Sequence, residues 1–467
     1  MGLNETEHAE GTHISPDDLS EFTNHANFSV ISSLFPTENN LFFKWGGEIG
    51  TAPDLTYSFI NSGPFELDDH YIEDMGNDAN RFLQHINSSA DNGPVEFSET
   101  QKTLIQKSLD SWSNVSGIDF IEVIDNKDSY GDLRFIQLDF DKWGSHDSVF
   151  ETAAAFAYHP LGGDGYSVNS IGGDIFFDVE YQPYDCYFEH VVSHEIGHAL
   201  GLAHPFDGYQ PIGTSSDSLD NHLTVMTYDK EPEIYAISPM PIDIMAMEFL
   251  YGGSSEANID DTTYELDVDL FNTYENGHLE NTGYYPRSLG ARSSIVDDGG
   301  TDTLIVDGFK NGVALNLQPG SWSNLASNSQ YLIAENDTNT GVQIASSFVS
   351  GEALSVSSDE DNREHGQLYI ESQSFIENCN LTEFDDVVFD NSSDNIIRCG
   401  DGNDLVSLSF GTDMIYGGEG TDTVSIFGVS EGFKAKYSNL MNESGVSETF
   451  IVLEKLNSTE ESIFLRD

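Results

Sequence analysis

The stretch HEIGHALGLAH, residues 194–204, holds three histidines and a glutamate at spacings that suit a metal site. Positions four apart lie on the same face of an α-helix, so His194 and His198 can aim their rings at one point. Gly201 lets the helix end and the chain turn, and His204 can then return to that point. Three nitrogen ligands leave an open position on zinc, which is typical of a catalytic site and not of a closed structural one.

Glu195 follows the first histidine, so its carboxylate projects beside the predicted metal. A base in that position can take a proton from metal-bound water, and we therefore predict Glu195 as a general base. For the short pattern HExxH alone, a surface helix with two histidines is a competing interpretation. The extended pattern with five matching positions makes that interpretation much the weaker one.

The charge of the chain excludes some classes of partner. The 467 residues are enough for two or three domains, and 17 Lys and Arg against 81 Asp and Glu give a formal net charge of −64. Nucleic acids and anionic membranes need a basic footprint, so neither is expected as a partner. Calcium binding and solubility in salty water both explain acidity, and we expect both to contribute.

The cysteines and the apolar runs limit the class of protein further. Cys186, Cys379 and Cys399 are far apart and odd in number, so neither a disulfide framework nor a cysteine-based zinc site is expected. The N-terminal residues have no basic start and no apolar run, so they do not match a classical secretory signal. No apolar run is long enough for membrane insertion.

Changes in sequence character predict three parts. Residues 1–40 are polar and acidic, as in a leader or pro-segment. Residues 41–253 mix strand patterns with helical periodicity, which predicts an α+β domain with a mixed twisted sheet and long helices. Residues 254–467 have short β-rich runs between Gly, Asp, Asn and Ser turns, which predicts an all-β domain.

The stretch AAAFAYHP, residues 153–160, predicts an edge strand that ends at Pro160. An extended substrate can pair its backbone with such an edge. The residues expected to do so are Ala153, Ala154, Ala155, Phe156 and Ala157. His159 follows the strand, and we interpret it as structural because the third zinc ligand is already supplied.

A nine-residue repeat runs through the predicted all-β domain. Its acidic or amide position falls at Asp386, Asn395, Asp404, Asp413 and Asp422, and an aliphatic residue follows two positions later each time. Stacked nonapeptides form a parallel β-roll that binds calcium between turns. The competing interpretation is a loop-rich β-domain without bound ions.

Two nearly complete repeats, 399–407 and 417–425, predict one good calcium site between them. The expected calcium ligands here are Gly400, Asp401, Gly402, Asp404, Gly418, Gly420 and Asp422. The similar turn DDGGTDTL adds Asp297, Gly299, Gly300 and Asp302 as candidate ligands.

Further motifs connect the chain with a known family. TVMTYD places Met226 and Tyr228 downstream of the histidines. Together with LTYSFI, GGDIFFD, PMPIDIMAMEFLYG, DDGGTDTL and the nonapeptides, the motifs make residues 50–430 resemble the serralysins, secreted bacterial zinc metalloproteases of the metzincin clan. The resemblance implies one catalytic zinc, bound by His194, His198 and His204, and structural calcium in a C-terminal β-roll. It makes Tyr228 an additional zinc ligand that stabilises the transition state, with Met226 beneath the zinc.

We therefore predict a secreted zinc-dependent endopeptidase that hydrolyses extended polypeptides with zinc-activated water. The resemblance also implies export by a type I-like route, a monomeric state and a proteinaceous inhibitor as a partner class. The alternative is a calcium-dependent binding or adhesive surface protein whose protease domain is latent or inactive. That alternative predicts that the glutamate or one of the histidines of the motif is replaced, and all four residues are present.

Overall fold

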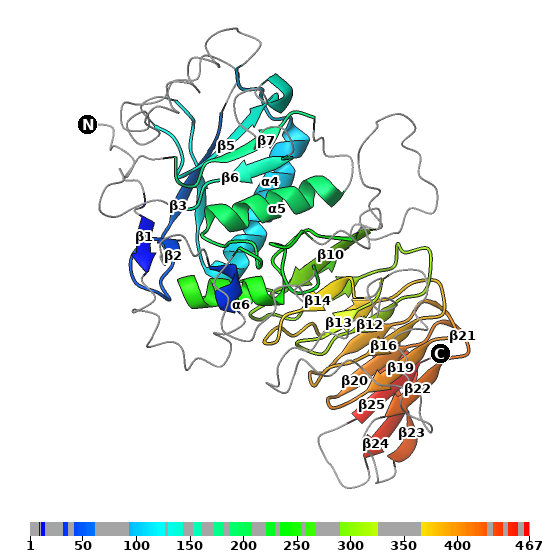
Figure 1. Ribbon diagram of the computed structural model, residues 1–467. Helices are drawn as coiled ribbons and strands as arrows, with labels where there is room; N and C mark the ends of the chain where they lie inside the picture. The colour runs from blue at the N-terminus through cyan, green and yellow to red at the C-terminus, as the bar shows by residue number, and fades with distance from the viewer. Residues whose placement is uncertain are drawn as a thin grey trace, which may run out of the picture. The chain divides into compact units, whose positions relative to one another are not determined.

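The chain forms two compact units in this computed structural model. Unit 1 consists of Met1–Lys230 and Tyr235–Ser255, and unit 2 of Glu231–Ile234 and Glu256–Asp467. The structure describes residues 9, 11–14, 31–35, 42–60, 93–126, 129–142, 153–160, 171–180, 186–207, 221–228, 234–254, 257–266, 290–325, 366–426, 433–441, 447–455 and 462–466. Among these, helices of more than one turn occur in unit 1 only (Figure 1).

A five-stranded sheet forms the framework of unit 1. Its strand order is β4 (Phe120–Glu122), β3 (Leu55–Phe59), β5 (Leu133–Leu138), β7 (Ile175–Asp178) and β6 (Ala155–Ala157). All neighbours are parallel except β6, which runs antiparallel to β7. Inward rings such as Phe135 and Phe177 are fully buried, so the sheet is one wall of the core. Strand β6 lies at the end of the order, as the sequence predicts for an edge strand.

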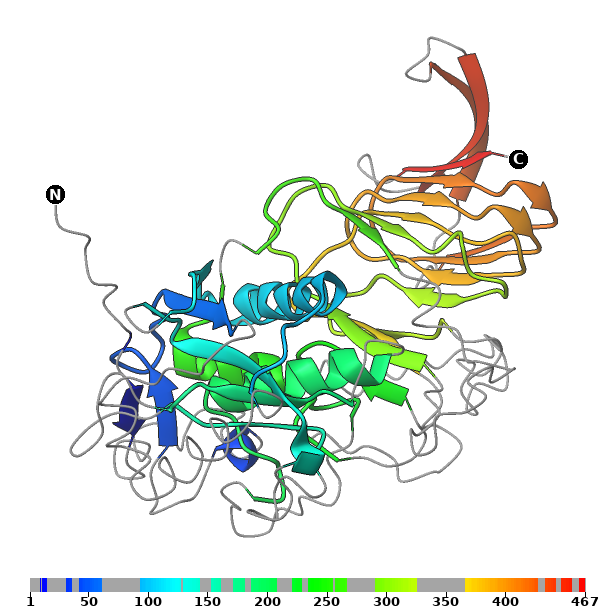
Figure 2. The ribbon, with the colours of Figure 1, turned by 90° about the horizontal axis from the view of Figure 1, so that it is seen from above.

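Three helices complete the described core of unit 1: α4 (Glu99–Ser116), α5 (Cys186–Ala199) and α6 (Pro241–Tyr251). Ser98 caps the start of α4 with a capping box. Its side chain accepts a hydrogen bond from the Gln101 backbone amide, and the Gln101 side chain accepts one from the Ser98 backbone amide. Both views show α4 and α5 side by side (Figures 1 and 2). The buried indole of Trp112 joins them by donating to the Ser193 carbonyl oxygen at 3.1 Å. No helix in the described ranges is long and apolar enough to cross a membrane.

The described residues of the predicted leader pack onto unit 1. Strand β1 (Gly11–Ile14) pairs antiparallel with β2 (Phe42–Trp45). The short 3-10 helix η1 (Ser32–Leu34) is buried, and the Leu34 carbonyl oxygen accepts a 2.6 Å hydrogen bond from the Ala203 amide. The boundary at residue 40 stays a prediction, but residues 31–35 belong to the core of unit 1.

Unit 2 consists of short strands that alternate between two sheets. Parallel neighbours in one sheet are β9 (Thr263–Glu265), β11 (Thr303–Ile305), β15 (Asn378–Asn380), β17 (Ile396–Arg398) and β20 (Asp413–Tyr416). Those in the other are β12 (Ala314–Asn316), β16 (Val387–Phe389), β19 (Leu405–Leu408) and β22 (Thr423–Ile426). Figure 2 shows the strands stacked in layers. Along the nonapeptides, successive strands go to opposite sheets, so equivalent residues on one edge are 18 apart.

The remaining strands extend these sheets or form small ones. β25 (Ser462–Arg466) joins β20 in parallel, and β24 (Ser447–Lys455) and β23 (Phe433–Met441) follow antiparallel. β10 (Gly290–Ile295), β14 (Leu368–Ile370) and β13 (Trp322–Ser323) are neighbours in a further sheet, and β18 (Asp401–Gly402) pairs with β21 (Glu419–Gly420). β8 (Ile234–Ala236) lies at the boundary between the two units in the chain.

A buried aspartate ties helix α6 to the segment that contains Met226. Asp243, with no exposed surface, accepts hydrogen bonds from the Thr224 hydroxyl at 2.6 Å, the Val225 amide at 2.7 Å and the Met240 amide at 2.9 Å. Burial raises the pKa of Asp243 to about 7, against the opposing effect of its three donors. The carboxyl group therefore keeps its proton in the folded chain at pH values where an unfolded chain loses it.

This pKa makes stability depend on pH in a defined direction. Between pH 4 and pH 7 the unfolded chain binds fewer protons at residue 243 than the folded chain, so rising pH favours unfolding. We expect the stability of the parent relative to Asp243→Asn, which cannot titrate, to fall by about 1.4 kcal/mol per pH unit across that window. Calorimetry of both proteins from pH 4 to pH 8, at constant salt and calcium, measures the difference. A difference that is flat or rises with pH would mean that the buried carboxyl is ionised.

Candidate metal centre

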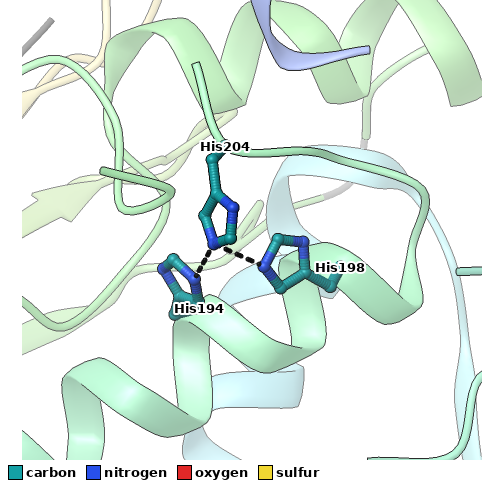
Figure 3. A group of neighbouring side chains, drawn as sticks. All are labelled: His194, His198 and His204. Atoms are coloured by element: carbon teal, nitrogen blue, oxygen red, sulfur yellow. Dashed lines mark hydrogen bonds between the residues drawn. The ribbon is translucent and has the colours of Figure 1, made fainter. Parts of the chain in front are cut away.

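The three histidines of the opening motif converge at the end of helix α5. His194 and His198 project from the helix, and the Nε2 atom of each lies 3.1 Å from His204 Nε2 (Figure 3). Gly201, at φ +106°, turns the chain back, and any Cβ there would overlap the Phe43 carbonyl oxygen of β2. Within the described ranges this is the one group of three or more His, Cys, Asp or Glu side chains that could hold a metal ion with side-chain ligand atoms alone, and these atoms all lie within 4.8 Å of one another.

The outer ring nitrogens decide the tautomer of each histidine. Nδ1 of His194 faces the Val225 carbonyl oxygen at 2.9 Å, and Nδ1 of His198 faces the Leu202 carbonyl oxygen at 2.7 Å. His204 Nδ1 lies 3.0 Å from Asp207 Oδ2. Because these oxygens can only accept, each Nδ1 carries the proton and each Nε2 keeps its lone pair.

Three convergent lone pairs repel one another unless a cation lies between them. Between neutral rings these short separations are therefore not hydrogen bonds, and they suit the ligands of a shared cation. Burial also lowers the pKa of all three histidines, which favours the neutral, ligating form. Three neutral imidazoles with open positions opposite them fit zinc.

Glu195 lies in the same buried turn of α5 and has no partner for one oxygen. Its side chain is 6% exposed, and Oε2 has no hydrogen-bond partner among the described residues. Burial raises the pKa of Glu195 to about 8. A dication beside the carboxylate would favour its ionised form, so the orphaned oxygen is consistent with a metal nearby.

Two exposed aromatic rings lie next to His204. The Tyr228 ring centroid is 4.3 Å from that of His204 and 5.5 Å from that of His194, and the side chain is 57% exposed. Burial of part of the ring, and then the charges of Glu195 and Asp207, raise the pKa of Tyr228 to about 12. The hydroxyl therefore stays protonated at neutral pH and can donate. The structure thus brings the Tyr228 ring beside the histidines, in the neighbourhood that the resemblance implies.

Phe206 was not predicted from the sequence. Its ring stacks on His204, with centroids 4.8 Å apart and an interplanar angle of 11°, and is 44% exposed. An aromatic residue two positions after the third histidine could have been noticed, but its stacking depends on the turn that follows Gly201.

Met226 packs against helix α5 at Gly197. The residue is fully buried, and a Cβ on Gly197 would overlap its sulfur and lie 3.1 Å from Trp112 Cζ2. Gly197 is therefore required by this packing, which explains the central glycine of HEIGH. The backbone next to Met226 also orients the site, because the Val225 carbonyl accepts the His194 proton.

The predicted edge strand is shorter than its sequence pattern. Regular pairing spans β6, Ala155–Ala157, and single hydrogen bonds to β7 and its flank extend it to Ala154 and Tyr158. Ala153 lies before this ladder. His159, directly after it, donates from Nε2 to the Leu202 carbonyl oxygen at 2.9 Å.

The predicted calcium ligands of the nonapeptides lie in a ladder of aspartates. Oδ1 of Asp404 accepts the Asp386 amide, and Oδ1 of Asp422 accepts the Asp404 amide, 18 residues apart each time. Oδ2 of Asp404 is buried without a hydrogen-bond partner among the described residues. By contrast, both oxygens of Asp386 are bonded, to the Val313 amide and to Thr382. Asp404, 18 residues after Asp386 in the ladder, therefore has the free carboxylate oxygen that a calcium ion needs.

The glycines of these turns allow close stacking. Gly418 has φ +93° and Gly420 φ +144°, and a Cβ on either would overlap the carbonyl oxygen of Gly400 or Gly402 in the turn below. Asp401, on β18, is exposed and is not a member of the aspartate ladder.

The turn DDGGTDTL has a similar arrangement. Asp297 accepts from the Tyr264 hydroxyl at 2.6 Å and from the Gly299 amide at 3.0 Å. Asp302 Oδ1 accepts the Thr262 amide, and its buried Oδ2 has no hydrogen-bond partner in the described part of the chain. Gly300, at φ +126°, lies against the Asp260 carbonyl.

The contact between Gly197 and Met226 makes a test of the packing beneath the histidines. At an ordinary helix position, Gly→Ala stabilises by up to about 1 kcal/mol. Here we expect Gly197→Ala to destabilise by about 1–3 kcal/mol, because the methyl group overpacks the sulfur, and to weaken zinc binding. Chemical unfolding and zinc titration measure both effects. Adding Met226→Ala should recover part of the loss, and strictly additive effects would contradict the packing argument.

The comparisons with known proteins agree with this geometry. Residues 86–210, which include the histidine motif, match the matrixin family of peptidases. The chain is 27% identical over 306 residues to serralysin B of Dickeya chrysanthemi, covering 60% of this chain and 55% of that protein. It is 28% identical over 319 residues to metallopeptidase AprA of Pseudomonas marginalis, covering 63% of this chain and 58% of that protein. Serralysin of Proteus mirabilis is 28% identical over 311 residues, which are 60% of this chain and 55% of that protein. The chain thus spans little more than half the length of these relatives, and the similarities support a serralysin-like metzincin.

Proposed function

We propose that this protein is a zinc-dependent endopeptidase with Glu195 as its general base. The observation that carries the proposal is the convergence of three Nε2 lone pairs beside a buried carboxylate with an orphaned oxygen. The names of the relatives, serralysin and metallopeptidase, point to the same class of reaction.

The residues divide the chemistry between them. Zinc bound by the three imidazoles supplies Lewis acidity at the open side of the site. Glu195 Oε2 takes the proton of the attacking water and passes it to the departing amine. The Tyr228 hydroxyl, protonated at neutral pH, donates to the developing negative charge on the carbonyl oxygen of the substrate. Because two of the histidines and Glu195 are buried, these charges act with little screening by water.

The substrate of the proposed reaction is an extended polypeptide. Strand β6 is the last of the described strands in its sheet, so the backbone groups that face away from β7 can pair with another chain. The exposed rings of Phe206 and Tyr228 lie beside His204 and offer apolar contacts to side chains near the scissile bond. A proteinaceous inhibitor and a monomeric state stay predictions.

We also propose that unit 2 is a calcium-binding β-roll and that the protein is exported. The two alternating parallel sheets, the aspartate ladder and the unsatisfied oxygens of Asp404 and Asp302 support bound calcium. Export is proposed from the similarity to serralysins and from the acidity of the chain. A calcium-dependent adhesive protein with an inactive protease domain is the alternative, and the intact triad with Glu195 argues against it.

The first test removes the proposed base. We expect Glu195→Ala to lower hydrolysis of a quenched-fluorescent casein by about 10²- to 10⁴-fold, because proton transfer is lost, while zinc stays near one per chain. Fluorescence assays in calcium buffer, with metal analysis of both proteins, check this. Equal activity in the two proteins would remove Glu195 from the mechanism. Inactivity of both, with zinc bound, would favour the adhesive alternative.

A second test concerns the calcium site of unit 2. Calcium at about 100 times its Kd stabilises a protein by about 2.7 kcal/mol per site. We expect Asp404→Asn to lose this calcium-dependent gain, because its free oxygen is replaced by an amide. In contrast, Asp386→Asn should lose stability equally with and without calcium, because its oxygens bond to the protein. Thermal unfolding across a calcium titration distinguishes them, and an unchanged calcium response in Asp404→Asn would exclude it as a ligand.

A further inference from the structure

A histidine outside the triad contacts the loop that carries the third ligand. His159 follows the edge strand β6, and its Nε2 lies 2.9 Å from the Leu202 carbonyl oxygen. That oxygen also accepts the Nδ1 proton of His198 at 2.7 Å. The two imidazoles meet at right angles, with ring centroids 5.5 Å apart.

Leu202 connects two of the predicted zinc ligands. Its amide donates to the Gly197 carbonyl oxygen at 2.9 Å, and the next amide, of Ala203, donates to Leu34. The peptide is therefore held at both ends between His198 and His204. A carbonyl oxygen has two lone pairs, and here each of them accepts from one imidazole N–H. The direction of the Leu202 carbonyl thus depends on His159 as well as on His198.

His159 is not itself a ligand. Its Nε2 carries a proton, because the Leu202 carbonyl oxygen accepts it, and the metal-suited cluster in the described ranges contains only the other three histidines. Its ring instead stacks on Phe43 of β2, at 6.4 Å between centroids and an interplanar angle of 16°. Phe43 in turn holds Gly201, since its carbonyl oxygen occupies the space of a Cβ there.

We propose that His159 is a positioning residue, which sets the zinc affinity by holding the Leu202 carbonyl in place for His198. The inference rests on the proposed zinc site. It gives the end of the edge strand a second role, because the chain at β6 both pairs with substrate and supplies the group that orients a ligand of the metal. Outer partners of metal-binding histidines change metal affinity by about 10- to 100-fold when they are removed.

The test compares three variants. His159→Leu keeps an apolar side chain against Phe43 but removes the N–H group. His159→Gln restores a donor close to the position of Nε2. Tyr158→Leu is the matched control, because it changes the neighbouring exposed ring, which contacts Phe156 and Phe176.

Zinc dissociation constants are measured by competition with a chromophoric chelator in calcium buffer, together with the Tm of the zinc-free proteins. We expect His159→Leu to raise the zinc Kd about tenfold, with His159→Gln and Tyr158→Leu close to the parent. The zinc-free Tm should change no more in His159→Leu than in Tyr158→Leu. The absorption spectrum of the cobalt(II)-loaded protein should shift in His159→Leu and return in His159→Gln.

The opposite results overturn the proposal. A zinc Kd of His159→Leu equal to that of Tyr158→Leu, or a glutamine variant no better than the leucine variant, would make His159 merely structural. Because metal affinity is measured without substrate, these outcomes are separate from the proposed function. A parent that binds zinc tightly and cleaves no polypeptide would refute the peptidase and leave the affinity comparison intact.

Discussion

The whole site depends on where three imidazole protons go. Each Nδ1–H is bonded to an oxygen outside the triad, so each Nε2 presents its lone pair to the same small volume. Two of the three acceptors are backbone carbonyls, at Val225 and Leu202, and the third is the carboxylate of Asp207. The geometry of the metal site is therefore held by the backbone of two loops, and those loops are held in turn by the core of unit 1.

This dependence explains residues that have no role in the chemistry. Asp243 accepts the amide of Val225, and so fixes the carbonyl that holds His194. Trp45 donates to the Ala199 carbonyl at the end of α5, and the Tyr251 hydroxyl donates to that of Leu200, so the last carbonyls of the helix are satisfied before the turn at Gly201. Lys44, beside Trp45, is also buried, and its ammonium group donates to three backbone carbonyls.

The sequence predicted the parts of the site that lie close together in the chain. His194, Glu195 and His198 follow from the period of a helix, and Gly201 with His204 from the way a helix ends. The nine-residue repeat predicted the stacking of strands in unit 2 because each turn contacts its equivalents at a constant separation of 18 residues. Spacing of this kind is visible in one sequence because it is local or periodic.

Other parts depend on contacts between distant segments, which no spacing reveals. Glycine is needed at position 197 because the Met226 sulfur occupies the space of a Cβ there. Residues 31–35 belong to the core in part because the Leu34 carbonyl oxygen accepts a hydrogen bond from the Ala203 amide. Polar composition suggested a leader or pro-segment, and only the fold shows that residues 31–35 within it are buried in the core of unit 1. His159 shows the same limit. Its interpretation as structural was reasonable for a histidine after an edge strand, and only the fold places it on the carbonyl that His198 also needs.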